Sequence, residues 1–409
     1  MVSSALIVRG VTVLDGKGGR SSSPRDVLIE EGRITAVRPR ISPAEDVREI
    51  DGTGRFLLPG FIDAHVHLRL PGTPINPATS LHEPPTLRLY RATKNMRATL
   101  RAGVTYVRDL GGIDYGAKMA VDYGEILGPR IVPALQAIGP TGGHTDYRTL
   151  GGFAQDRDTP GLSISPLADG PTEAVLRTRE LHRAGAGVIK VMGTGGVWSP
   201  RDSPEHDGFS PEELSAIVTE ATNRGLPVAA HAQGINGIKN SIRAGVTSIE
   251  HGYSIDDEAI ELMRSGGVWL VPTLLTGLTP PTGDGVPDYA RAKKVKLQQA
   301  LKQNISRAVD AGVKIAMGTD SGVVPHGNNL QELVHLVECG MTPMQAIMAG
   351  TSHAAELLGI DETVGSVEVG KDADLVIADV DPESDISALS DPRHIKVVLQ
   401  RGRVVHTNS

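Results

Sequence analysis

Residues 60–68 read GFIDAHVHL, an apolar strand that carries one aspartate and two histidines within five positions. Side chains two positions apart on a strand point to the same face, so Asp63, His65 and His67 share one side of it. Seven more short β-branched runs follow, each with a polar or glycine-rich turn and then a helical pattern. They lie at residues 104–109, 131–138, 187–193, 226–232, 246–252, 268–274 and 313–319.

Strands that are apolar on both faces and alternate with helices are typical of a parallel sheet that helices cover on the outside. Eight such units predict an α/β fold with a closed (β/α)8 TIM-like barrel over residues 60–357. The two ends of the chain instead carry short strands joined by glycine turns, at residues 5–16, 26–39, 373–382 and 394–406. They predict a second, small β-sandwich domain built from residues 1–59 and 358–409.

Charge and cysteine content exclude several classes of protein. The net charge is −7 and no basic stripe is present, which argues against nucleic acid as a partner. The single cysteine, Cys339, excludes a disulfide framework and a cysteine-based zinc site. The N-terminus lacks the pattern of a signal peptide, and no apolar run reaches the about 18 residues that a membrane span needs. We therefore expect a cytoplasmic protein without a membrane partner.

The C-terminal ends of barrel strands carry the chemistry of this fold. Each polar residue there has an ordinary explanation when it is taken alone, such as a hydrogen-bonded core histidine or an aspartate that caps a turn. Lys190 is harder to explain in this way, because burying an unpaired ammonium in an apolar strand is costly. The set that converges on one end of the barrel is His65, His67, Lys190, His231, His251 and Asp320.

This set predicts a metal centre. Imidazole and carboxylate groups suit zinc and related divalent ions. A single catalytic zinc takes three protein ligands and keeps one position open, so six candidates indicate two ions, with zinc as the expected metal. Lys190 cannot bind a metal as an ammonium. It can do so as a carbamate, formed with carbon dioxide, which would bridge the ions; an unmodified lysine is the alternative.

Several motifs give the chain a resemblance to a known family. They are PGFIDAHVHL (59–68), VIKVMGTGG (188–196), HAQG (231–234), IEHG (249–252), GTDSG (318–322) and VGSVEVGKDADLVIAD (364–379). The chain resembles the amidohydrolase superfamily, in its imidazolonepropionase-like and prolidase-like binuclear branch. The resemblance implies that His65, His67 and Asp320 hold one ion and that His231 and His251 hold the other. Carboxylated Lys190 and a hydroxide would bridge the two ions.

The resemblance also implies an enzyme that cleaves a C–N amide bond by the bridging hydroxide. Asp320 would take the proton of the attacking water and pass it to the leaving amine. The expected substrate is a small molecule: a dipeptide, an N-acyl amino acid, or a related aryl amide or carbamate. His144 matches a position that contacts substrate in similar proteins. Weaker substrate candidates near strand ends are Tyr253, Arg108 and Trp198; Arg108 would bind a substrate carboxylate or pair with Asp109.

Two alternatives stay open at this point. The same site can serve another bond, such as that of a lactone, a cyclic amide or an organophosphate ester. The fold can also serve as a scaffold without activity, although the intact ligand set speaks against this. We further expect a homo-oligomer, a rim loop at residues 276–291 that shapes specificity, and a supporting role for Asp63 below the histidines.

Overall fold

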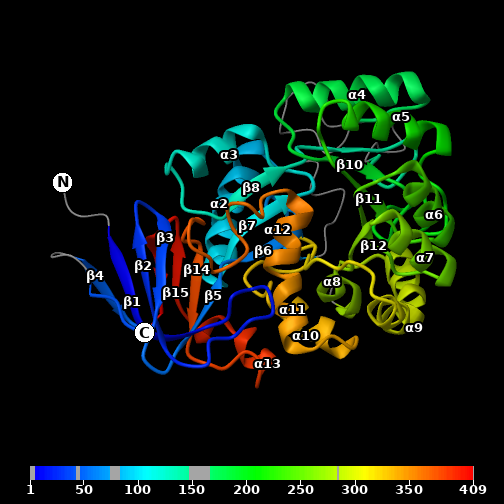
Figure 1. The fold of residues 1–409 in the computed structure, drawn as a ribbon. Helices are drawn as coiled ribbons and strands as arrows, with labels where there is room; N and C mark the ends of the chain where they lie inside the picture. The colour runs from blue at the N-terminus through cyan, green and yellow to red at the C-terminus, as the bar shows by residue number, and fades with distance from the viewer. Residues whose placement is uncertain (1–4, 43–46, 74–82, 147–165, 283–284, 409) are drawn as a thin grey trace.

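The structure is a computed structural model that describes residues 5–42, 47–73, 83–146, 166–282 and 285–408. Its larger part is the barrel (Figure 1). Three parallel strands form one arc, and these are β6 (Phe61–Val66), β7 (Val104–Asp109) and β8 (Arg130–Pro133). Five parallel strands form the other arc: β9 (Ala137–Ile138), β10 (Ile189–Met192), β11 (Val228–Ala232), β12 (Ser248–His251) and β13 (Trp269–Val271).

Two of the predicted strands differ in the structure. Residues 131–138 divide into β8 and β9, because Leu135 between them adopts a positive φ of 65°. Residues 313–319 form no regular strand. Single bridges nevertheless join Ile315 to Leu270 of β13, and Ser321 to Val66 of β6. This segment therefore occupies the eighth position and connects the two arcs.

Helices cover the outside of the strands (Figure 1). The longer ones are α2 (Pro85–Arg101), α4 (Pro171–Arg183), α5 (Pro211–Thr222), α6 (Ile235–Ala244), α7 (Asp257–Gly266) and α9 (Asp288–Asp310). The shorter ones are α3 (Tyr115–Asp122), α8 (Leu274–Leu278), α10 (Gln331–Glu338), α11 (Pro343–Ala349), α12 (Ser352–Leu358), α13 (Ile386–Leu389) and the 3-10 helix η1 (Pro392–His394). No helix in the described ranges combines the length and apolar composition that a bilayer crossing needs.

Strands from both ends of the chain lie together, as expected, and form one mixed sheet. The order is β16 (Arg403–Thr407), β15 (Ile395–Gln400), β14 (Leu375–Ala378), β5 (Phe56–Pro59), β1 (Leu6–Val13), β2 (Arg25–Glu30) and β3 (Arg33–Arg38). Strand β4 (Arg48–Asp51) pairs with β1 off this path. Figure 1 shows the blue N-terminal strands beside the orange and red C-terminal ones. The sheet has an apolar cluster of its own, apart from the barrel core.

One buried arginine joins the sheet to the barrel. Arg130 begins β8, and its guanidinium lies 2.8 Å from Asp372 and 2.7 Å from Asp374, which precede β14. The backbone repeats this connection, because the Gly60 N–H donates to the Asp374 carbonyl at 2.7 Å. The position of the first barrel strand is thus fixed against the C-terminal part of the sheet.

Candidate metal centre

Strand-end residues converge on one cavity of about 450 Å³. All six of the metal-ligand candidates line it: His65, His67, Lys190, His231, His251 and Asp320. They reach it from β6, β10, β11, β12 and the segment that follows Ile315. Parallel strands end on one side of a barrel, so residues far apart in sequence meet there.

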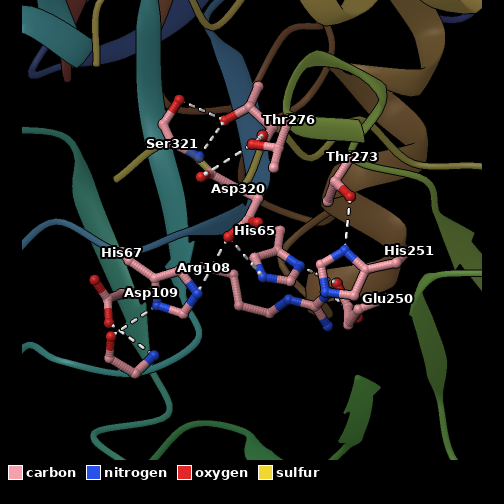
Figure 2. Close-up of polar contacts among 12 residues, drawn as sticks. His65, His67, Arg108, Asp109, Glu250, His251, Thr273, Thr276, Asp320 and Ser321 are labelled. Atoms are coloured by element: carbon pink, nitrogen blue, oxygen red, sulfur yellow. Dashed lines mark hydrogen bonds and ion pairs between the residues drawn. The ribbon is translucent and has the colours of Figure 1, made fainter. Parts of the chain in front are cut away.

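His65, His67 and Asp320 form the tightest group. One ligand atom from each lies within 4.8 Å of the others. Oδ1 of Asp320 is 3.3 Å from Nε2 of His67 and 3.6 Å from Nε2 of His65, and Figure 2 shows both rings turned toward the carboxylate. Two imidazoles and one carboxylate at this spacing suit a divalent ion such as zinc.

The other candidates lie directly beside this group. The ring centroids of His231 and His251 are 4.6 Å apart, and those of His65 and His251 are 5.1 Å apart. Nζ of Lys190 is fully buried and has no hydrogen-bond partner among the residues that the structure describes. Burying an amine without a hydrogen-bond partner is costly, so the Lys190 amine is a candidate for binding a further group.

Each of the four histidines is held through one ring nitrogen, and the other nitrogen is the one that could bind an ion. The acceptors are backbone or side-chain oxygens, as is usual for imidazoles that bind metals. The pairs are His65 Nδ1 with Glu250 Oε2 at 2.8 Å, His67 Nδ1 with the Gly111 carbonyl at 2.8 Å, His251 Nδ1 with Thr273 Oγ1 at 2.8 Å, and His231 Nε2 with the Gly195 carbonyl at 3.1 Å.

The protonation states favour cation binding. Burial lowers the pKa of His251 to about 3 and holds the pKa values of His65 and His231 well below normal, so these rings are neutral. Burial alone would raise the pKa of Asp320, but the hydrogen bond from His67 lowers it below its ordinary value, and the same contact raises the pKa of His67. Neutral imidazoles and an ionised carboxylate are the forms that coordinate metals.

Two cavity residues, and one residue that contacts one of them, adopt backbone conformations that are rare outside glycine. The φ angles are 73° at His251, 49° at Thr273 and 57° at Asp320. Each such residue costs on the order of 1–3 kcal/mol, and such residues persist where the surrounding contacts fix them. Here the strained positions coincide with two candidate ligands and with the residue that holds His251.

Asp63 lies below the ligands and contacts the loop that carries Asp320. Its carboxylate accepts hydrogen bonds from the backbone of His65 and Thr319, both at 3.1 Å, and from the Thr319 hydroxyl at 2.6 Å. Asn329 donates to it at 2.7 Å. These contacts fit the support that was expected of Asp63.

Arg108 is not at the cavity. It is 1% exposed, and its guanidinium donates to the Ala64 carbonyl at 2.6 Å and to Glu250 at 2.8 Å. Neither of the expected partners, a substrate carboxylate or Asp109, matches these contacts. The sequence shows an arginine next to an aspartate, whereas the actual partner is 142 positions away on β12.

The other three substrate candidates do line the cavity. The His144 ring stacks on His231 with centroids 4.5 Å apart, and its Nδ1 lies 2.9 Å from Ser199 Oγ. The Tyr253 hydroxyl lies 2.9 Å from Thr273 Oγ1. Trp198 is held through its carbonyl, which accepts from the Tyr289 hydroxyl at 3.1 Å.

Among the polar cavity residues that the sequence did not indicate, two stand close to the reacting centre: Gln233 and Lys294. Gln233 stands two positions after His231, and its buried Oε1 has no hydrogen-bond partner within the described part of the chain. The HAQG motif contained this signal, because alternate residues on a strand share a face. Lys294 reaches the cavity from α9, which no strand-end pattern indicates. The expected rim loop at 276–291 holds part of α8 and the start of α9, while residues 283–284 lie outside the described ranges.

Comparison with known proteins places this site in context. Residues 56–405 match the model of the Amidohydrolase family. The ochratoxinase of Aspergillus niger is 34% identical over 378 residues, which cover 88% of this chain and 78% of that protein. A crystal structure of a Xaa-Pro dipeptidase with bound methionine superimposes with a TM-score of 0.89 at 32% identity, over 99% of this chain and 100% of the other. A prolidase complexed with N-methylphosphonate-L-proline gives a TM-score of 0.93 at 33% identity, with the same coverage.

Proposed function

The chain belongs to the amidohydrolase family and is a metal-dependent amidohydrolase related to prolidase and ochratoxinase, and from this premise we propose that it hydrolyses the C–N amide bond of a dipeptide or N-acyl amino acid. One observation carries the proposal. Four histidines, one aspartate and a buried lysine line a single cavity, and none of the described residues forms a hydrogen bond with the lysine amine.

We assign the residues as follows. His65, His67 and Asp320 would hold one divalent ion, and His231 and His251 would hold a second. When bound, such ions lower the pKa of water and polarise a substrate carbonyl. The donor set supports zinc, because it combines imidazoles with an ionised carboxylate.

Lys190 would join the two ions as a carbamate. Burial lowers the pKa of its amine to about 8, so a larger neutral fraction exists near neutral pH than for an ordinary lysine. The neutral amine is the form that attacks carbon dioxide. The product is an anion with two oxygens, which removes the cost of a buried amine without a partner and adds ligands where they are needed.

Asp320 would move the proton of the reaction. Its carboxylate stays ionised and lines the cavity, 3.6 Å from His65 and 3.3 Å from His67, so it can accept a proton from the attacking water. Amines leave poorly as anions, and the same carboxyl group would then protonate the leaving nitrogen. His144 would contact the substrate carbonyl from the opposite wall. The Ser199 hydroxyl, which donates to Asp202, holds its Nδ1.

The solved relatives support an amino-acid-like substrate. One holds methionine in its active site, and another holds a phosphonate derivative of proline. We therefore rank dipeptides and N-acyl amino acids above aryl amides and carbamates.

Metal analysis and a substrate screen test the proposal together. The purified protein should contain about two divalent ions per chain. It should hydrolyse members of a panel of dipeptides and N-acetyl amino acids, and it should be inactive toward lactones and phosphate esters. Native mass spectrometry should show the extra mass of one carbon dioxide, which acid removes. A stable protein without metal, or one active only on lactones or phosphate esters, would overturn the proposal.

The Asp320→Asn variant supplies the mechanistic control. Asparagine keeps the shape of the side chain but cannot shuttle a proton, so turnover should fall by about 100-fold or more. Asp361→Asn, at an exposed turn far from the cavity, should leave turnover unchanged. Near-normal turnover in Asp320→Asn would exclude the proton-transfer role.

A further inference from the structure

Lys294 is a buried cation in the cavity wall. It lies on α9, is 7% exposed, and lines the cavity together with the metal-ligand candidates. Its ammonium donates to the Thr276 carbonyl at 2.8 Å. Within the described ranges, no carboxylate lies within ion-pair distance of it, whereas Lys296 on the same helix pairs with Glu205 at 2.6 Å.

One neutral carbonyl does not compensate for burying an ammonium. A lysine has three donors, and a buried charge is normally paired. Burial lowers the pKa of Lys294 to about 8, so the amine is still protonated in most molecules at neutral pH. The charge of Lys294 therefore lacks a compensating anion, and the side chain lines the space that a substrate would enter.

The location of this charge relative to the reacting centre is fixed by Thr276. The Thr276 carbonyl holds Lys294, and the Thr276 hydroxyl donates to the Thr319 carbonyl at 2.9 Å. Figure 2 shows Thr276 next to Asp320. The negative charge of Asp320 also acts on Lys294, because it opposes the fall in the Lys294 pKa. Thr276 thus connects the ammonium to the backbone that carries Asp320, the residue that would handle the proton.

Other charges in the lining do not supply the missing anion. Glu83 also lines the cavity, but it is already paired, with Arg91 at 2.7 Å and Arg88 at 3.6 Å. Apart from the metal-ligand candidate Asp320, no carboxylate in the described cavity lining is available to pair with Lys294. A cavity of this kind attracts a ligand that brings its own negative charge.

We propose that Lys294 binds the free carboxylate of the amino acid that leaves in the reaction. The inference rests on the proposed function and narrows its substrate class. In a dipeptide or N-acyl amino acid, the carboxylate lies one residue beyond the scissile carbonyl, or about 3.3–3.6 Å along an extended chain. Lys294 and Asp320 line the same cavity and both contact Thr276, so the ammonium is placed to meet a group beyond the scissile bond. An aryl amide or carbamate without a carboxylate would leave the cation unpaired.

Paired substrates test this assignment. Each N-acetyl-L-amino acid that the enzyme cleaves is compared with its C-terminal amide, which removes only the negative charge. The wild type should favour the acid by about 10- to 100-fold in kcat/KM, mostly through KM. In Lys294→Met, kcat/KM for the acid should fall until this preference is lost. The value for the amide should stay within about 3-fold of the wild-type value. Lys296→Met, on the same helix but exposed, should keep the preference.

A binding measurement separates this inference from the proposed function. Benzoylpropionate has a methylene in place of the amide N–H of benzoylglycine, so it offers the same carboxylate without a cleavable bond. Calorimetry of the metal-loaded wild type should show tighter binding of benzoylpropionate than of its carboxamide. Lys294→Met should remove the difference, and its thermal unfolding serves as the check on folding.

The outcomes are distinct. Equal binding of the acid and the carboxamide by the wild type overturns the Lys294 assignment, whether or not amides are hydrolysed. Preferential binding of the acid that depends on Lys294, in a protein that cleaves no amide, keeps the carboxylate site and overturns the proposed function. A preference that survives in Lys294→Met assigns the carboxylate to another residue and also overturns the inference.

Discussion

Glu250 influences the metal centre although it does not face the cavity. It is fully buried in β12, where Oε2 lies 2.8 Å from Nδ1 of His65 and Oε1 accepts from Arg108 at 2.8 Å. The carboxylate fixes the orientation of the imidazole and increases its basicity as a ligand. Arg108 in turn compensates the buried negative charge, so the pair acts as one support for His65.

Replacing Glu250 by glutamine tests this support. Glutamine keeps the size of the side chain but removes the charge, so the metal affinity should fall by about 10- to 100-fold. Competition with a chelating dye measures this affinity directly. Glu338→Gln is the matched control, because Glu338 also lies near a histidine, His335 at 3.3 Å, but on the surface. If both variants bind metal like the wild type, Glu250 does not tune the site.

Residues at strand ends could be predicted from the sequence, whereas their supports could not. His65, His231 and Lys190 were found because strand periodicity places them at one end of the barrel. Glu250 and Arg108 pair across the barrel interior, and no local pattern shows such a contact. Lys294 stands in the run KKVK, which reads as a solvated helix face. Only the packing of α9 buries Lys294 while it leaves Lys296 exposed.

At the scale of elements, capping residues mark where several helices begin and end. Ser210 caps α5 and forms a reciprocal pair with Glu213, and Thr342 does the same with Gln345 at α11. Helices α6 and α7 end at glycines in the left-handed conformation. Helix α12, in the sequence TSHAAELLG (351–359), also follows a threonine but lacks such a cap. The Thr351 hydroxyl instead donates to the Ile347 carbonyl.

The capping box of α5 gives a prediction on stability. Ser210→Ala removes the hydroxyl that accepts from the Glu213 N–H, so the free energy of unfolding should fall by about 1 kcal/mol. Urea denaturation followed by circular dichroism measures the change. Ser265→Ala serves as the control, since that exposed hydroxyl donates only to carbonyls of its own helix. Turnover should be unchanged in both variants, and an unchanged urea midpoint in Ser210→Ala would contradict the prediction.

The strands that departed from expectation did so for conformational reasons. Leu135, with a φ of 65°, interrupts the third strand, although leucine rarely adopts this conformation and so gives no warning in the sequence. At the eighth strand position, the segment around residues 313–321 is joined to its neighbours by single bridges and forms no regular ladder. This segment leads into Asp320, whose positive φ turns the chain toward the cavity.

At the scale of the whole molecule, the terminal sheet and the barrel depend on each other. Strand β5 leads directly into β6, and β5 pairs with β14 on one side and β1 on the other. Arg130 adds an ionic contact from the barrel to Asp372 and Asp374. We therefore expect the proposed division into residues 1–59 with 358–409, and residues 60–357, to describe two parts that do not fold separately.

A truncation tests this dependence. A chain of residues 1–357 loses β14, β15 and β16, which exposes the edge of β5 and leaves Arg130 buried without its carboxylates. It should aggregate when expressed alone, as measured by the soluble fraction and by size-exclusion chromatography. Co-expression of residues 358–409 should restore soluble protein. A soluble 1–357 chain with normal metal content would show that the barrel folds independently.

The order of strands in the terminal sheet also matters while the protein is being made. Strand β5 leaves the ribosome early, but its neighbour β14 follows about 315 residues later. At about 5–20 residues per second, this delay amounts to roughly 15–60 s. During that interval the nascent chain presents an open β5 edge to the cell. Protection of this edge by a chaperone would therefore be needed during translation and not after it.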